Sequence, residues 1–178
     1  VMATQNPLEQ EGTYPRPEAQ LDRFLMHVWV SYPEAEEELA ILRLVRDEQS
    51  SRSPTEGLNL PRSSILAART AVQQVYLAEP LERYIVDLVQ ATRHAGRYDA
   101  QLGRYIHLGA SPRASLALDR CSRALAWLKG RQEVLPKDIQ QLAPDILRHR
   151  LLLSYEADAE GVRADAIIQR LLSLVAVA

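Results

Sequence analysis

The 178 residues lack the two motifs that a complete nucleotide hydrolase needs. None of the seven glycines is followed by Lys and then Ser or Thr, so no phosphate-binding P-loop is present. No apolar strand ends in the paired acids that would hold Mg²⁺. By itself, the chain is therefore expected to be inactive in nucleotide hydrolysis.

The sequence also gives little support for a metal site or for a catalytic nucleophile. One cysteine, Cys121, excludes an internal disulfide framework and fits a reducing compartment. The four histidines show no ligand spacing with one another or with Cys121, so we expect no zinc site. No nucleophile-elbow pattern occurs, although residue order alone leaves a Ser/His/Asp triad open.

Charge and hydrophobicity are unremarkable for a folded chain. The net charge of −2 gives no electrostatic case for nucleic acid or an anionic membrane. Apolar runs such as residues 171–178 fall short of the roughly 20 residues that a bilayer requires. No charged segment followed by an apolar one opens the chain as a signal peptide would. With 47% hydrophobic residues, we expect a soluble, cytoplasmic protein with a real core.

Two strands are predicted near the start. Residues 1–3 are apolar and end in a polar tip, and Leu25 to Tyr32 alternate apolar with polar residues. Because two strands do not make a stable sheet, further strands must come from outside this chain or from another copy. We therefore expect a truncated gene product or a fragment.

After Tyr32 the pattern is helical. Ser31 and Glu34 read as a capping box, and the glutamates 36–38 suit a solvated first turn better than a metal site. A polar linker is expected at 49–59. Further helices are expected at 62–76, from 80, at 111–129, from 136 through a break or kink at Pro144, and at 165–175.

Apolar spacing predicts which side of each helix faces the core. The sets are Ile65, Ala68, Val72 and Val75; Leu81, Tyr84, Ile85, Leu88, Val89 and Thr92; Leu116, Ala117, Ala124, Leu125 and Leu128; Ile139, Leu142 and Ala143; and Ile168, Leu171, Leu172 and Val175.

One arginine-containing stretch and one single arginine are candidates for binding an anion. Residues 93–105 mix arginines with tyrosines, which fits either single-stranded nucleic acid or, as we favour, a loop beside a nucleotide or a neighbouring subunit. Arg113 lies in the first turn of a helix that begins with Ser111 as N-cap, where the helix dipole disfavours a cation. Helix amides and an arginine together bind phosphate, so we expect an anion there.

Three strings resemble one family over nearly the whole chain. Residues 3–15 (ATQNPLEQEGTYP), Leu21-Asp22-Arg23-Phe24 and Gly109-Ala110-Ser111-Pro112-Arg113 are similar to the part of MoxR-type AAA+ ATPases that follows the Walker B motif. The resemblance implies a mainly α chain. Residues 1–33 would be a two-stranded remnant of the α/β ATPase core, and residues 34–178 would contain the all-α lid, with its motif at 109–115.

The resemblance also implies roles for three residues. Asn6 is similar to sensor 1, which orients the attacking water, although Asn-Pro alone is an ordinary turn former. Arg23 resembles the arginine finger that reaches the nucleotide of the next subunit, and otherwise reads as a surface arginine. Arg113 resembles sensor 2, which contacts bound ATP, and could otherwise pair with an acid such as Asp119.

The implied activity is that of the C-terminal part of a ring, expected to be a hexamer. The intact protein would use ATP and Mg²⁺ to remodel a partner, typically one with a von Willebrand factor A domain. A free-standing, non-enzymatic lid-like module and a magnesium-chelatase-type subunit remain alternatives, although residues 5–12 fit MoxR better. The chain departs from the family at Arg16 and in a longer 94–107 stretch. The family-like Arg148 to Leu153 segment is interpreted as lid packing.

Overall fold

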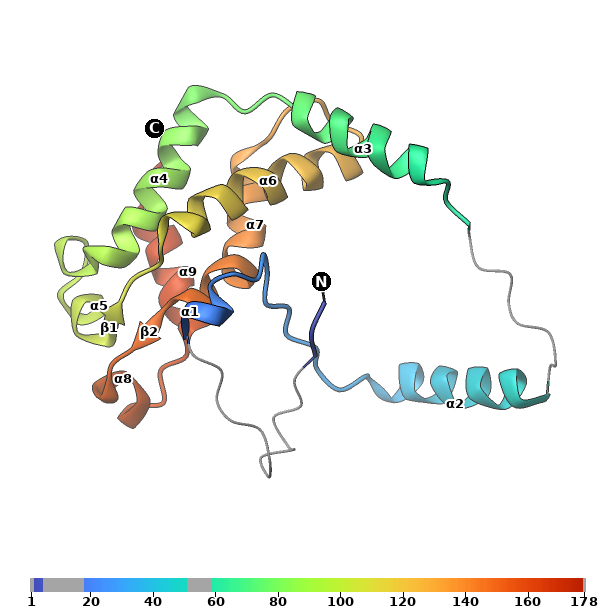
Figure 1. Cartoon of the computed structure of the whole chain (residues 1–178). Coiled ribbons are helices and arrows are strands. Elements are labelled where there is room, and N and C mark those ends of the chain that lie inside the picture. Colours follow the sequence, from blue (N-terminus) through green and yellow to red (C-terminus); the bar gives the residue numbers. More distant parts are fainter. Residues whose placement is uncertain (1, 5–17, 51–58, 178) are drawn as a thin grey trace.

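A computed structural model describes residues 2–4, 18–50 and 59–177 (Figure 1). The helices are α1 (Glu18–Leu21), α2 (Ala35–Ser50), α3 (Arg62–Gln74), α4 (Glu79–Arg93), α5 (Ala100–Tyr105), α6 (Pro112–Leu128), α7 (Pro136–Leu147), α8 (Tyr155–Ala159) and α9 (Ala164–Leu174), with 3-10 turns η1 (Ala95–Arg97) and η2 (Arg148–Arg150). The strands are β1 (Ile106–Leu108) and β2 (Leu152–Leu153). The expected mainly α fold is confirmed.

One hydrophobic core joins the helices of the second half of the chain. Helices α4, α6, α7 and α9 pack around it (Figure 1), and each contributes a fully buried large side chain: Tyr84, Leu118, Ile146 and Ile168. All six residues predicted to face inward on α4 are buried, because their spacing follows the 3.6-residue period of one helix face. The helices that surround this core carry the residues of the candidate site described below.

Helix α6 begins and ends as predicted but buries a different face. Ser111 is its N-cap, and Gly130 follows its end with the positive φ of 71° that suits glycine. Leu116 and Leu128, expected in the core, are 56% and 73% exposed. The side that α6 buries carries mostly small residues, which allow close packing against α4 and α7: Ala114, Ala117, Leu118, Cys121, Ser122 and Ala126.

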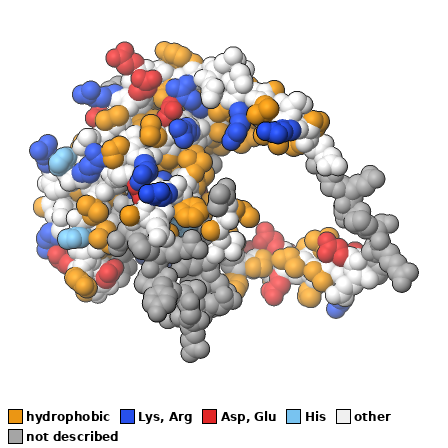
Figure 2. All heavy atoms as spheres, viewed as in Figure 1, with side chains coloured by type: hydrophobic (Ala, Val, Ile, Leu, Met, Phe, Trp, Pro, Cys, Tyr) orange, Lys and Arg blue, Asp and Glu red, His pale blue; other side chains and the backbone are white. Residues whose placement is uncertain are grey.

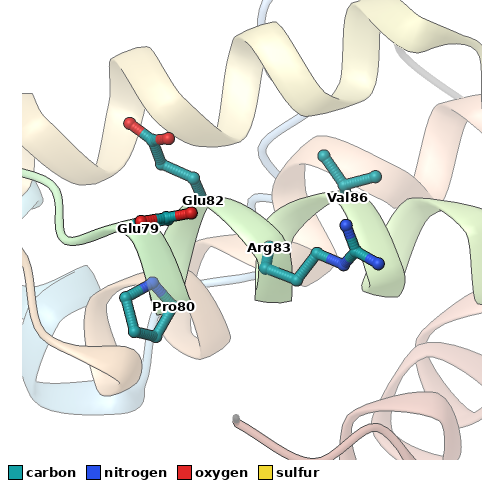
Figure 3. A pocket seen from close by; sticks show the side chains of 5 residues that line it. All are labelled: Glu79, Pro80, Glu82, Arg83 and Val86. Carbon is teal, nitrogen blue, oxygen red and sulfur yellow. The ribbon is translucent and has the colours of Figure 1, made fainter.

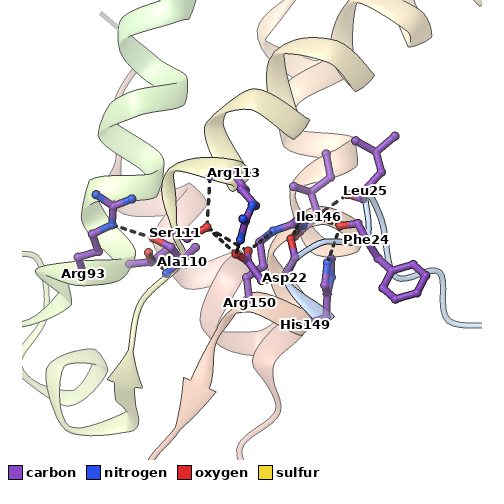
Figure 4. Close-up of polar contacts among 11 residues, drawn as sticks. Asp22, Phe24, Leu25, Arg93, Ala110, Ser111, Arg113, Ile146, His149 and Arg150 are labelled. Atoms are coloured by element: carbon purple, nitrogen blue, oxygen red, sulfur yellow. Dashed lines mark hydrogen bonds and ion pairs between the residues drawn. The ribbon is translucent and has the colours of Figure 1, made fainter. Parts of the chain in front are cut away.

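Helix α7 continues through Pro144 instead of breaking there. The proline lies in the last turn, so its missing N–H removes only one hydrogen bond near the helix end. Ile139 and Ala143 are buried as predicted. Beyond α7 the chain turns through η2, and this turn places Arg150 close to Asp22 and the start of α6 (Figure 4).

The two strands lie in the lid and not at the predicted positions. Strand β1 pairs antiparallel with β2, with Ile106 opposite Leu153. Residues 2–4 and 26–34 form no strand. A strand is stabilised by hydrogen bonds to a neighbour, and the described residues offer neither segment one.

Helices α2 and α3 contribute little to the core. In Figure 1, α2 lies apart from the other helices, and Figure 2 shows hydrophobic side chains along it. The apolar residues Leu39, Leu42 and Val45, which follow helical spacing on α2, are exposed, as is Ile65 on α3. Helix α2 begins at Ala35, after the predicted capping box of Ser31 and Glu34. At its start, the backbone N–H of Glu34 donates to the carboxylate of Glu37 at 3.1 Å.

The 94–107 stretch is ordered as η1, α5 and β1. Tyr105 is buried, so this aromatic residue belongs to the lid core. The expected linker falls mostly on residues 51–58, outside the described part of the chain. Across the described ranges, no helix has both the length and the hydrophobicity needed to cross a membrane.

Candidate functional site

The segment that follows α1 is bound along the end of α7 and η2. The backbone N–H of His27 donates to the carbonyl of Asp145 at 2.8 Å, and Arg148 Nη1 donates to the carbonyl of His27 at 2.6 Å. The ring Nε2 of His149 lies 3.3 Å from the carbonyl oxygen of Phe24. Residues 22–27 are therefore attached to the lid, although more than 100 residues separate the two in sequence.

Arg150 forms the centre of this attachment (Figure 4). Its side chain is only 2% exposed, and its Nε donates to Asp22 Oδ1 at 3.0 Å. Its other nitrogens donate to the carbonyls of Asp22 at 3.2 Å, Phe24 at 2.5 Å and Leu25 at 3.4 Å, and to that of Ile146 within α7. One buried guanidinium thus satisfies both a carboxylate and the carbonyls of a turn.

The carboxylate of Asp22 also binds the start of α6. The hydroxyl of Ser111 donates to its two oxygens at 3.0 and 2.9 Å, and Arg113 Nη1 donates to Oδ2 at 2.9 Å. The same hydroxyl accepts the backbone N–H of Arg113 at 3.2 Å, which is the N-cap bond of the helix. An anion does lie beside this helix start, and in this structure it is the side chain of Asp22.

The charges in this cluster shift the pKa of Asp22 downward. Burial favours the neutral acid, but hydrogen bonds from Arg113 and Ser111 and the charge of Arg150 outweigh it, so the pKa of Asp22 falls below its ordinary value. Burial lowers the pKa of Arg150, and the neighbouring Asp22 charge opposes that effect. Asp22 is ionised at neutral pH and shared between two arginines.

The loop before α6 is fixed by its contact with the end of α4. A Cβ on Gly109 would lie 2.6 Å from backbone atoms of Thr92, so only glycine fits. The N–H of Ala110 donates to the hydroxyl of Thr92 at 2.9 Å, and Arg93 Nε donates to the carbonyl of Ala110 at 2.7 Å. This packing sets the position of Ser111 and Arg113 relative to Asp22.

Comparison with known proteins assigns this arrangement to a family. The AAA lid domain family matches residues 102–171, and the ATPase family associated with various cellular activities (AAA) matches residues 1–26. Chaperone MoxR1 of Mycobacterium tuberculosis is 40% identical over 99% of this chain and 46% of its own length. The uncharacterized protein YeaC of Bacillus subtilis is 43% identical over 99% of this chain and 52% of its own.

A solved structure agrees in fold. The crystal structure of an inferred ATPase from Cytophaga hutchinsonii is 40% identical, has a TM-score of 0.87, and aligns with 98% of this chain and 52% of its own chain. The chain belongs to the MoxR branch of the AAA+ ATPases. It spans about half the length of the MoxR-type relatives that it matches.

The MoxR-type motif residues differ in whether the structure describes them and in what their side chains contact. Asn6 and the departing residue Arg16 lie outside the described residues. Arg23 follows α1 in a turn and is exposed, and among the described residues its side chain has no hydrogen-bond or ion-pair partner. Arg113 does not pair with Asp119, which instead accepts from Arg123 Nε at 2.7 Å. Its partner is Asp22, the residue before Arg23.

Sequence reasoning missed Asp22 and Arg150. Asp22 was part of the family-like string Leu-Asp-Arg-Phe but was assigned no role, and Arg150 was interpreted only as lid packing. Arg150 directly precedes the apolar run Leu151 to Leu153, and an arginine beside such a run is a signal for a buried ion pair. Its partner could not be read from sequence because 128 positions separate the two residues.

His149 is a second titratable group at this interface. Burial, followed by the nearby charge of Arg150, lowers the pKa of His149 to about 4. Its Nδ1 is buried and has no hydrogen-bond partner among the described residues, while Nε2 faces the carbonyl of Phe24, so the neutral Nε2–H form fits the geometry. In the described part of the chain, no group of His, Cys, Asp or Glu is placed to hold a metal ion.

A shallow hollow elsewhere carries no comparable chemistry. It lies on the first half of α4 and is lined by Glu79, Pro80, Glu82, Arg83 and Val86 (Figure 3). All five residues belong to one helix, and no second element among the described residues supplies a wall. We assign no role to this hollow in the MoxR-type chain.

Proposed function

We propose that this chain is the C-terminal part of an ATPase that couples ATP binding and hydrolysis in a ring, expected to be a hexamer, to chaperone-like remodelling of partner proteins. One relative carries the name chaperone. The observation that carries the proposal is the juxtaposition at Asp22. There the helix start bearing Arg113 meets the turn bearing Arg23, because Arg113 binds the carboxylate of Asp22, the residue that directly precedes Arg23.

Both arginines have side-chain donors that are exposed and available to phosphate. Arg113 is 55% exposed at its side chain and forms a single ion pair, so its remaining donors are available to an anion. Arg23 is exposed on the turn and unpaired within the described residues, as a residue that reaches the nucleotide of an adjacent subunit must be. Arginine fingers accelerate phosphoryl transfer by on the order of 10³- to 10⁵-fold because they stabilise developing charge.

The remaining parts of the active site would lie outside this chain. The P-loop and the acids that hold Mg²⁺ would be supplied by a preceding segment, and Asn6 would orient the attacking water. A partner with a von Willebrand factor A domain and a cytoplasmic location belong to the same proposal. They follow from the family resemblance.

A chimera tests the proposal. The part of the Cytophaga protein that this chain leaves unmatched would be joined to Val1 of this chain, with the intact Cytophaga protein as reference. We expect the chimera to form rings and to hydrolyse ATP. Substituting Arg113→Gln or Arg23→Gln should reduce turnover at least tenfold, because each removes a charge from the reacting phosphates.

The matched control is Arg170→Gln. Arg170 is also an exposed arginine paired with one aspartate, Asp99, at 3.1 Å, but it lies on α9 away from the cluster. Its substitution should leave turnover unchanged. Equal losses in all three variants, or a folded chimera without turnover beside an active reference, would overturn the proposed function.

A further inference from the structure

We propose that Asp22 is a positioning residue that links the nucleotide sensor Arg113 to the finger Arg23. The inference rests on the proposed function and concerns how its two arginines communicate. Asp22 accepts the guanidinium of Arg113 through its side chain and is joined to Arg23 by one peptide bond. A change at Arg113 therefore reaches the turn that carries Arg23 through a single residue.

The two arginines on Asp22 differ in how easily they can leave. Arg150 is 2% exposed and holds Asp22 together with three carbonyls of the same turn. Arg113 is 55% exposed and makes one ion pair. An exposed single ion pair contributes little to stability, whereas removing one partner of a buried pair is strongly destabilising. Arg150 is thus the fixed partner of Asp22, and Arg113 is the releasable one.

A bound triphosphate competes with Asp22 for Arg113. It carries more negative charge than one carboxylate and presents more acceptor oxygens, so the charge-assisted hydrogen bonds it offers are stronger. When Arg113 moves to phosphate, Asp22 keeps the charge of Arg150 and the hydroxyl of Ser111. Because no buried charge is left without a partner, the release of Arg113 from Asp22 costs little free energy.

The exchange acts on the backbone around Arg23. Arg150 binds the carbonyls of Asp22 and Phe24, which flank Arg23 on either side. With Arg113 attached, the turn is held to η2 by Arg150 and to α6 by both Ser111 and Arg113; with Arg113 released, only the hydroxyl of Ser111 still joins it to α6. ATP bound in one subunit would in this way free the turn whose arginine serves the next site.

Hydrogen exchange of the chimera tests this link directly. Amide exchange would be followed in peptides covering residues 19–27, with and without a slowly hydrolysed ATP analogue. Nucleotide should speed exchange of this segment severalfold in the parent chimera. In Arg113→Gln and Asp22→Asn, exchange should already be fast without nucleotide and should not respond to it.

Asp165→Asn is the control for a merely structural loss. Asp165 accepts from Arg148 Nε at 2.9 Å, and Arg148 holds the carbonyl of His27, so this substitution also loosens the segment. It does not contact Arg113. Exchange should rise in Asp165→Asn and still respond to nucleotide.

Turnover provides a second readout. If Asp22 acts through Arg113, the double variant Asp22→Asn/Arg113→Gln should be no slower than the slower single variant. Losses that multiply, or a segment 19–27 insensitive to nucleotide in an active chimera, would overturn the link alone. A chimera that folds but neither binds nor hydrolyses ATP would overturn the proposed function and the link together.

Discussion

At the scale of single residues, the close approach of Gly109 to α4 sets the position of the loop that leads into α6 and Arg113. A methyl group there would meet the carbonyl carbon and oxygen of Thr92, each at 2.6 Å, and the nitrogen of Arg93 at 2.7 Å. These atoms belong to a packed helix end and have little freedom to move. The glycine of the lid motif therefore has a steric reason that does not depend on nucleotide.

Gly109→Ala should therefore lower the free energy of unfolding by about 1–3 kcal/mol, because the overlap forces backbone to shift. Chemical denaturation followed by circular dichroism measures this change. Gly96→Ala is the matched control, since its Cβ would come no closer than 3.7 Å to Gly103. Equal stability of the two variants would contradict the steric account.

His149 should make the interface between residues 22–27 and the lid sensitive to acid. Its pKa is about 4 in the folded chain against an ordinary 6.5, so the unfolded chain takes up the proton first as pH falls. The stabilising contribution is complete above pH 6.5 and is lost progressively down to about pH 4. The loss amounts to about 3 kcal/mol for a shift of this size.

Unfolding free energies measured between pH 7 and pH 4 would check this expectation. His149→Gln keeps a donor for the carbonyl of Phe24 but cannot titrate, and it should flatten the profile over that window. His107→Gln, at an exposed position on β1, should leave the profile as it is. A wild-type profile that is flat from pH 6.5 to 4 would refute the role of His149.

At the scale of elements, η2 joins the lid to the turn after α1 through Arg150. We expect Arg150→Met to lower the free energy of unfolding by about 3–5 kcal/mol, since it removes the buried partner of Asp22 and leaves the carbonyls of Asp22 and Phe24 without this donor. Arg170→Met removes an exposed pair and should cost at most about 1 kcal/mol. Similar costs for both variants, measured by denaturation, would show that Arg150 is not an anchor.

Helix positions could be predicted where a helix buries one continuous face. The spacing on α4 identified all of its buried positions except Ala91, because large apolar residues mark most of that face. On α6 the buried side carries alanines, Cys121 and Ser122, while Leu116 and Leu128 face outward, so hydrophobicity alone chose the wrong side. The predicted strands failed because pairing depends on a neighbour that the local pattern cannot supply.

At the scale of the whole molecule, the candidate site joins segments that are distant in sequence. Motif resemblance predicts roles for Arg23 and Arg113, each from a short string around it, and these roles stay predictions. Asp22, Arg150 and the contact between them could not be predicted, because tertiary packing brings together residues 128 positions apart. Local pattern thus names the residues that carry a motif, whereas the contacts that relate them require the fold.

ATP hydrolysis by the purified 178-residue chain with Mg²⁺, beside the chimera at equal concentration, tests the central claim most directly. The account predicts no turnover by the chain alone, because its sequence contains neither a P-loop nor paired metal-binding acids. It predicts turnover by the chimera that depends on Arg113. Clear turnover by the isolated chain would contradict the account, since the phosphate and metal ligands would then have to lie among residues assigned to the lid.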